Sequence, residues 1–221
     1  SDPESEANYD EFVKVFSEKK DAFTTEFVGR YCDTDNLAAY MMAISFCGTT
    51  DGMQGVVFRD RKAEAPRWSW INWDMDHSFR DKSAAIIGYD RQPWEQEGIQ
   101  LAFPSKGNQS VRISLFYKLI TEDPRYRKFF LEKYVFALNH LITEAYFRKR
   151  LGHYEDIADR AGENGYSLLM PKREFLARRP AFIRFQLQEI FKLAPFRRFT
   201  VTGPDDVRYI IDGHREENGY A

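Results

Sequence analysis

The sequence predicts an α+β fold that is mostly helical and in which one β-hairpin carries an acidic site. Three observations support this prediction. Apolar residues recur at helical spacing over most of the chain. Residues 56–73 instead contain two short strand-like runs separated by a charged turn. Two aspartates, Asp74 and Asp76, follow the second run directly.

The amino-terminal half contains two predicted helices. Apolar residues fall on one stripe of Asn8–Val28, and Gly29 is expected to end this helix. The next helix, Asn36–Phe46, is apolar nearly all round and should therefore be buried. Asp33 or Asp35 would cap it, because aspartate accepts hydrogen bonds from the free amides of a first helical turn.

The carboxy-terminal half is predicted to stay helical to about Leu193. Asp123 would cap a helix that Pro124 begins. Gly152 should end another helix, and Pro180 should kink or split the last one. The expected helices are Ser110–Leu119, Pro124–Leu141, Thr143–Leu151, Tyr154–Ala161 and one starting at Pro171.

The composition limits the class of protein. With 221 residues, of which 43% are hydrophobic and 16% aromatic, the chain suits one large domain or two small ones with a core built on Phe and Tyr. A net charge of −2 argues against a general nucleic-acid binder, and the clusters Arg148-Lys149-Arg150 and Arg178-Arg179 are expected to be solvated. No apolar run reaches the length of a membrane span, and no signal peptide is recognisable at the start. Cys32 and Cys47 flank a predicted helix and are therefore expected to be free, largely buried thiols.

The acidic site is expected at one end of the hairpin. Residues two apart in an extended chain project to the same face, so Asp74 and Asp76 can point at one spot. Two such carboxylates repel each other unless a cation or a shared proton compensates them, and a hard divalent ion such as Mg²⁺ takes oxygen ligands. Asp51 precedes the first strand, Val56–Arg59, and antiparallel pairing would bring it to the same end. The alternative is that these aspartates only cap a turn or a helix.

Other catalytic motifs are missing from the sequence. It contains no H-E-x-x-H pair, no phosphate loop of the G-x-G-x-x-G or Walker A type, and no recognisable Ser-His-Asp arrangement. His77 is the one histidine beside the acidic pair. The long stretch from His77 to Gly107 would either cover the acidic end as an activation-type or substrate-docking segment or be a passive excursion.

Several motifs together resemble the spore coat protein H (CotH) kinase family. The resemblance covers about Asp10 to Leu193 and includes a later block from Leu115 to Ile157. The motifs that carry it are the D-x-D-N-x-x-x-Y helix Asp33-Thr34-Asp35-Asn36-Leu37-Ala38-Ala39-Tyr40, the loop Thr49-Thr50-Asp51, the strand Val56–Arg59, and the D-x-D element Trp70-Ile71-Asn72-Trp73-Asp74-Met75-Asp76.

The resemblance implies an atypical protein-kinase-like fold, of which this chain would form the carboxy-terminal lobe. It also implies transfer of a phosphoryl group from ATP to protein serines with Mg²⁺ or Mn²⁺. Asp51 would be the catalytic-loop aspartate that orients and deprotonates the acceptor hydroxyl. Asp74 would hold the metal and the cofactor, and Asp76 would be a second metal ligand or orient the first. The family carries Asn-Asn where this sequence has Gln54-Gly55, so Gln54 would act as the cofactor-binding side chain.

The resemblance also sets the expected organisation. Residues 1–8 would be a linker or an added remnant, and 9–195 the CotH-like catalytic lobe. Turn chemistry predicts that residues 196–221 form a β-hairpin of strands 199–202 and 207–211, either the start of a following module or a small terminal ribbon. The expected partners are a serine-containing protein substrate and an amino-terminal lobe, which would lie on the same parent protein or on another chain. The expected location is the spore coat, the cell envelope or the extracellular space.

Two other functions stay open on the sequence. A pseudokinase or a surface or coat scaffold would keep the fold without catalysis, and Gln54-Gly55 favours it. A glycosyltransferase also uses a D-x-D motif to hold a divalent ion on a sugar nucleotide. It would require an amino-terminal α/β nucleotide-binding sheet, and the helical bias of this chain speaks against it.

Overall fold

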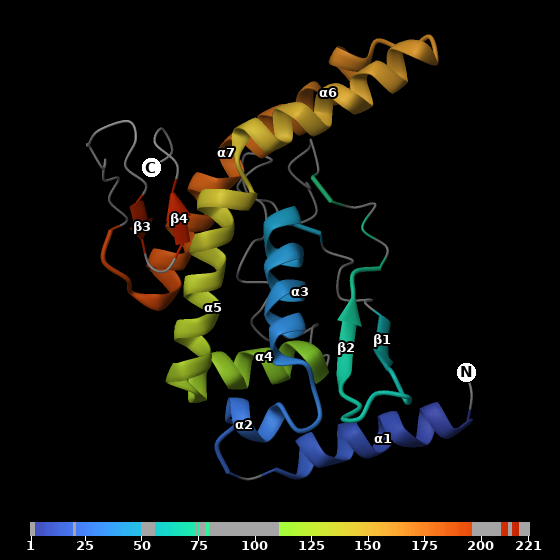
Figure 1. Ribbon diagram of the computed structural model, residues 1–221, viewed down its shortest axis with the longest axis vertical. Helices are drawn as coiled ribbons and strands as arrows, with labels where there is room; N and C mark the ends of the chain where they lie inside the picture. Colours follow the sequence, from blue (N-terminus) through green and yellow to red (C-terminus); the bar gives the residue numbers. More distant parts are fainter. Residues whose placement is uncertain are drawn as a thin grey trace, which may run out of the picture.

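The computed structural model is mostly helical, as the sequence predicts, with an antiparallel hairpin in its amino-terminal half (Figure 1). It describes residues 3–19, 21–49, 56–73, 75, 78–79 and 111–195, and the backbone of 209–211 and 214–216. Helix α3 stands in the centre, with the hairpin on one side and α5 on the other (Figure 1). The elements in order are α1 (Pro3–Glu18), α2 (Thr25–Val28), α3 (Thr34–Cys47), β1 (Val56–Arg59), β2 (Trp68–Ile71), α4 (Val111–Glu122), α5 (Pro124–Phe136), the π-helical turn η5 (Ala137–Leu141), α6 (Glu144–Arg160), α7 (Gly165–Phe191), β3 (Tyr209–Ile211) and β4 (His214–Glu216).

Helix α3 is largely buried, as its apolar sequence predicts. Asp33 caps its first turn by accepting a hydrogen bond from the Asn36 amide at 2.9 Å. The two cysteines near its ends, Cys32 and Cys47, are free, which confirms that prediction. The core around α3 is rich in aromatic side chains, as the composition indicates; its buried rings are those of Phe12, Phe16, Phe23, Tyr40, Phe46, Trp68, Trp70, Phe116, Tyr126, Phe130, Tyr134 and Phe175.

The first predicted helix forms as two. The stretch predicted as one helix, Asn8–Val28, is divided between α1 and α2, and α1 begins earlier, within the expected linker. In the gap, the Phe23 amide donates to Glu122 and the Thr25 amide donates to Asp123, each at 2.7 Å. These acceptors lie 99 and 98 positions along the chain. The start of α2 is thus set by the Thr24 cap and by contacts with the α4–α5 junction, which helical periodicity does not reveal.

Asp123 joins this gap to the start of α5. It accepts hydrogen bonds from the amide and the hydroxyl of Thr25 at 2.7 Å each, and from the Arg125 amide at 2.9 Å. The residue is buried, with 7% of its surface exposed. Burial raises the pKa of its carboxyl, but the hydrogen bonds from Thr25, Arg125 and Tyr126 outweigh burial and hold the pKa below its ordinary value of 3.8.

Asp123→Asn is expected to lower the free energy of unfolding by about 1–2 kcal/mol at pH 7, because an amide cannot accept all of these hydrogen bonds. The lowered pKa means that the carboxylate stabilises the folded state above pH 3.8, and that this stabilisation is lost as the pH falls through the folded-state pKa. Urea denaturation from neutral to acidic pH should therefore show the difference from wild type shrinking. A control at an exposed position on α6, Asp156→Asn, should change stability by less than about 0.5 kcal/mol. A difference for Asp123→Asn that is the same at every pH would contradict the prediction.

The hairpin forms where the sequence predicts it. β1 and β2 pair antiparallel, with Val56 opposite Ile71. The second strand is buried on one face only: Trp68 and Trp70 are buried, whereas Ile71 is 46% exposed and Trp73, just beyond the strand, is 60% exposed. Successive side chains of a strand point to opposite faces, and only one face of β2 packs against the protein.

Strand β2 is bonded to the start of α3. The Asn36 side chain accepts a hydrogen bond from the Trp70 amide at 2.6 Å and donates to the Trp70 carbonyl at 3.1 Å. The Trp68 amide donates to Tyr31 at 2.7 Å, and the Asp33 amide donates to the Trp68 carbonyl at 2.9 Å. The hairpin is therefore fixed relative to α3, which positions the end of β2 from which Asp74 and Asp76 follow.

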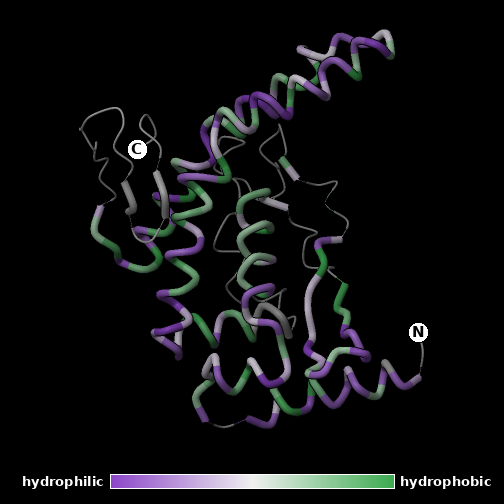
Figure 2. The backbone as a smooth tube through the Cα atoms, in the orientation of Figure 1, coloured by the Kyte–Doolittle hydropathy of each residue, from purple (hydrophilic) through white to green (hydrophobic). Residues whose placement is uncertain are grey.

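Helices α6 and α7 form an antiparallel arm that extends from the body (Figure 1). The predicted break at Gly152 is wrong, since α6 is continuous from Glu144 to Arg160. A glycine inside a helix costs only about 1 kcal/mol relative to alanine, which packing against α7 can offset. Hydrophilic and hydrophobic residues alternate along this arm, whereas α3 is coloured mostly white to green (Figure 2).

Helix α7 starts six residues earlier than predicted. It begins at Gly165 and continues through Pro171, where a start was predicted, and through Pro180. The signal for the true start is Asn164, whose side chain accepts a hydrogen bond from the Ser167 amide at 2.9 Å. Each proline removes one backbone hydrogen bond from a helix. Neither proline ends α7, so the prediction of a split at Pro180 is wrong.

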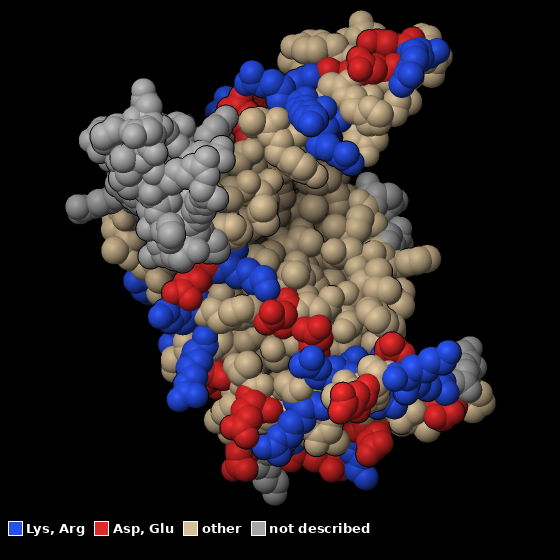
Figure 3. Space-filling view, viewed as in Figure 1, with Lys and Arg blue, Asp and Glu red and all other residues tan. Residues whose placement is uncertain are grey.

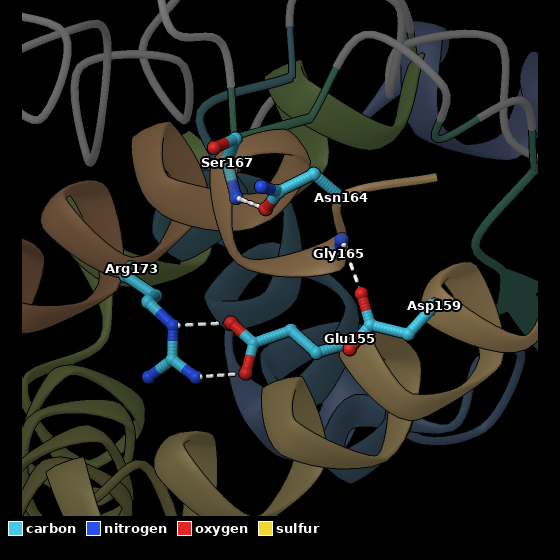
Figure 4. Close-up of polar contacts among 6 residues, drawn as sticks. All are labelled: Glu155, Asp159, Asn164, Gly165, Ser167 and Arg173. Atoms are coloured by element: carbon cyan, nitrogen blue, oxygen red, sulfur yellow. Dashed lines mark hydrogen bonds and ion pairs between the residues drawn. The ribbon is translucent and has the colours of Figure 1, made fainter. Parts of the chain in front are cut away.

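Polar contacts hold α6 and α7 together where the chain turns between them (Figure 4). Arg173 donates to both carboxylate oxygens of Glu155, with Nε 2.6 Å from Oε1. The Gly165 amide donates to the Asp159 carboxylate at 2.8 Å. A Cβ atom on Gly165 would lie 2.4 Å from the Glu155 carbonyl oxygen. The two helices are in backbone contact here, which only glycine permits.

The carboxy-terminal hairpin differs from the predicted one. β3 pairs antiparallel with β4, so Ile211 lies opposite His214 and the partner strand follows β3 in the sequence. The predicted partner at residues 199–202 lies outside the described residues.

Candidate functional site

The predicted site residues themselves lie outside the residues that the structure describes, as does most of the stretch between His77 and Gly107. Their neighbours are described, and these define where the acidic parts of the chain begin and end. The residues concerned are Asp51, Gln54, Asp74 and Asp76.

Two acid-bearing segments, residues 48–55 and 72–78, lie between the same two pairs of bonded residues. At one end, the first residue of β1 is the pairing partner of the last residue of β2. At the other end, the Phe79 amide donates a hydrogen bond to the Cys47 carbonyl at 3.0 Å. The chain therefore gives both segments the same two anchor points, one on the hairpin and one at the end of α3.

Phe79 is held in place by helix α7. The Lys172 ammonium donates to the Phe79 carbonyl oxygen, and the rings of Phe79 and Phe175 pack edge to face with centroids 5.5 Å apart. Phe79 has a φ of 54°, in the left-handed region that costs a non-glycine residue roughly 1–2 kcal/mol. The contacts with α7 and Cys47 stabilise this conformation, and residues held in this way are concentrated at functional sites.

Arg179, also on α7, holds the end of α3. Its Nε donates to the Phe46 carbonyl at 2.8 Å and its Nη2 to the Ser45 carbonyl at 2.7 Å. The last carbonyl groups of a helix carry partial negative charge, which favours a cation there. Burial lowers the pKa of Arg179 to about 10, so the guanidinium stays charged at neutral pH. The prediction that Arg178-Arg179 is solvated is thus wrong for Arg179, which has no exposed surface.

Two buried hydroxyl groups lie within the acid-bearing segments close to the α3 anchor. Thr49 has no exposed surface and Ser78 is 8% exposed. Neither hydroxyl oxygen has a hydrogen-bond partner among the described residues. A buried polar group left without a partner costs about 1–3 kcal/mol, so each hydroxyl is expected to have a hydrogen-bond partner beyond the described residues.

Sequence reasoning missed Arg179, Lys172 and the two buried hydroxyls. One signal was available: positions 172, 175 and 179 fall on one face of a helix. That spacing does not say what the face contacts, because the acceptors on α3 and at Phe79 are backbone carbonyl groups from distant parts of the chain.

The described surface separates charged from uncharged areas. In Figure 3, Lys, Arg, Asp and Glu side chains gather over the base and along the arm, and an uncharged, hollowed face lies between them.

Within the described ranges, no group of three or more His, Cys, Asp or Glu side chains is placed to hold a metal ion. None of the described helices is both long enough and apolar enough to cross a lipid bilayer.

Comparison with known proteins identifies the family. The sequence model of the family described as "CotH kinase protein" matches residues 1–166, a range that includes the hairpin and both acid-bearing segments. No curated protein and no solved structure matches the chain. The family match covers 166 of the 221 residues and agrees with the resemblance carried by the sequence motifs. The chain therefore belongs to the CotH kinase family.

Proposed function

We propose that this protein is an atypical protein kinase that transfers the γ-phosphoryl group of ATP to protein serines with Mg²⁺ or Mn²⁺. Membership of the CotH kinase family supports this reaction class. The observation that carries the proposal is the pair of shared anchor points, from which the segment with Asp51 and the segment with Asp74 and Asp76 both extend. Phosphoryl transfer depends mainly on positioning and charge neutralisation, which acidic groups on two such segments would provide.

Each acidic residue has a separate role in this proposal. Asp51 orients the serine hydroxyl and takes its proton while the serine oxygen bonds to the γ-phosphorus; the bond from that phosphorus to the bridging oxygen breaks, and ADP leaves. Asp74 would hold the metal, and Asp76 would be a second ligand or orient the first. The Gln54 amide contributes a further oxygen. A donor set made of oxygens fits a hard divalent ion, which when bound neutralises charge on the phosphates.

The Thr49 and Ser78 hydroxyls, which have no hydrogen-bond partner among the described residues, fit this assignment because a buried polar group is normally hydrogen-bonded. The proposal also includes a protein-kinase-like carboxy-terminal lobe as the fold and an amino-terminal lobe as a partner. A serine-containing protein is the proposed substrate. The spore coat, the cell envelope or the extracellular space is the proposed location.

Metal and nucleotide binding can be measured before a protein substrate is known. Mn²⁺ and ATP together are expected to raise the Tm of the purified protein by about 5–10 °C at about 100 times Kd, since this corresponds to about 2.7 kcal/mol. Asp74→Ala should remove most of this shift, because the proposed ligand of the metal is lost. The control Asp60→Ala, in the turn of the β1–β2 hairpin, should keep it.

Differential scanning fluorimetry with Mn²⁺ alone, ATP alone and both together separates the alternatives. A shift with Mn²⁺ that ATP does not increase would indicate that nucleotide binding requires the amino-terminal lobe. No shift with either ligand would contradict the kinase proposal. It would favour the pseudokinase or coat scaffold, with which Gln54-Gly55 agrees.

A further inference from the structure

We infer that helix α7 holds the anchor that the two acid-bearing segments share at Cys47 and Phe79, with Lys172, Phe175 and Arg179 as positioning residues for phosphoryl transfer. The inference rests on the proposed function, since it assigns these residues to the same site. It goes beyond the family match, which ends at residue 166 and includes none of the three.

The three residues form one surface of α7. Their spacing of three and then four positions places them on the same face of a helix. Phe175 and Arg179 have no exposed surface, and Lys172 is partly buried. The Arg179 guanidinium lies over the Phe175 ring, 5.1 Å from its centroid. A face this well packed has little freedom to move relative to the helix that carries it.

Arg179 fixes the direction in which the chain leaves α3. Its two hydrogen bonds hold carbonyl groups of the last turn, at Ser45 and Phe46. Gly48 then ends the helix with a φ of 63°, and Asp51 follows three residues later. The planar guanidinium binds two acceptors in a fixed geometry, which a lysine ammonium does not reproduce.

Lys172 and Phe175 fix the return of the second acid-bearing segment. They hold the carbonyl group and the ring of Phe79, which lies three residues after Asp76. Phe79 is also bonded to Cys47, one residue beyond the carbonyl of Phe46 that Arg179 holds. Helix α7 thus contacts both the end of α3 and Phe79, which are themselves joined by the hydrogen bond between Phe79 and Cys47. The beginning of the first segment is in this way held next to the end of the second.

Lys172→Met tests this role without removing a fully buried group. Methionine keeps the apolar stem and loses only the donor. We expect kcat for phosphoryl transfer to serine peptides to fall about 10- to 100-fold with KM for ATP changed less than about threefold, because a displacement of about 1 Å near a catalytic group costs about 10²-fold. The Mn²⁺- and ATP-dependent rise in Tm should remain. Lys172→Arg, which restores a donor, should recover most of the lost rate.

Arg179→Lys tests the α3 side while keeping the positive charge. It should also lower kcat more than it changes KM for ATP, since one ammonium cannot satisfy both carbonyl groups in the same geometry. The matched control is the neighbouring exposed residue: Arg178→Met should leave kcat within about twofold of wild type.

The outcomes separate this inference from the function on which it rests. An inactive wild-type protein would overturn the proposed function and the inference together. An active wild type in which Lys172→Met and Arg179→Lys keep kcat within about twofold would overturn the inference alone. Loss of rate in Lys172→Met that Lys172→Arg does not recover, or that comes with loss of the ligand-dependent Tm shift, would also overturn it.

Discussion

Asp51→Asn is expected to lower kcat for phosphoryl transfer by about 10²- to 10⁴-fold, the usual contribution of a general base. Asparagine has nearly the same shape but cannot take the serine proton. The Mn²⁺- and ATP-dependent Tm shift should persist, because the substitution leaves the proposed metal ligands Asp74 and Asp76 and the Gln54 amide unchanged. Initial rates of phosphate transfer from ATP to serine peptides, measured with excess ATP, would show the loss as a change in kcat.

The control for this experiment is Asp60→Asn, which makes the same chemical change in an exposed turn of the hairpin. It should keep kcat within about twofold of wild type. ATP consumption at equal rates in wild type and Asp51→Asn would exclude the kinase mechanism proposed for this protein. A loss of folding in Asp51→Asn would be visible as a lowered Tm without ligand and would not resemble the expected result.

Gly165→Ala is expected to destabilise the protein by about 1–3 kcal/mol, the usual cost of overpacking. The new Cβ would lie 2.4 Å from the Glu155 carbonyl oxygen, 2.7 Å from its Cα and 2.9 Å from its carbonyl carbon. These are backbone atoms of α6, so the clash cannot be relieved by a change of rotamer. The two helices must separate, which also disturbs the pair of Arg173 with Glu155. Urea denaturation measures the loss, which should lower Tm by about 2–4 °C per kcal/mol.

The matched control for Gly165→Ala is Gly152→Ala on the same arm. A Cβ on Gly152 would have no atom within 4 Å. Since alanine is the better helix former by about 1 kcal/mol, this variant should be as stable as wild type or more stable. Equal effects of the two substitutions would show that helix propensity, and not the backbone contact at Gly165, determines the result.

The parts of the fold that the sequence predicts are those with local signals. The apolar sequence of α3, the Asp123-Pro124 start of α5 and the two runs of the hairpin each determine their own structure. The break between α1 and α2 was not predicted from apolar periodicity, because Thr24 signals only the start of α2 and the Phe23 and Thr25 amides are bonded to carboxylates on a distant junction. The continuity of α6 through Gly152 also depends on a partner, α7, that the local sequence does not identify.

The candidate site also has parts that local sequence signals predict and parts that they do not. The antiparallel pairing of Val56 with Ile71 confirms the strand geometry from which a common acidic end is predicted. The roles of Asp51 and Asp74 stay predictions, because both residues lie outside the described ranges. The hydrogen bonds from Arg179 to the end of α3 could not be predicted, since a pair of arginines on a helix is typical of a solvated face. The acceptors of Arg179 are main-chain carbonyl groups, which the sequence does not single out.

The acceptors of Arg179 have a consequence for how this family can diverge. Every amino acid supplies a main-chain carbonyl group, so residues 45 and 46 can change during evolution without removing the two hydrogen bonds. The arginine has no such freedom, because no other side chain offers the same planar pair of donors. We therefore expect relatives with the same two hydrogen bonds to retain the arginine of α7 without correlated substitutions on α3. Covariation between pairs of positions would not detect this contact.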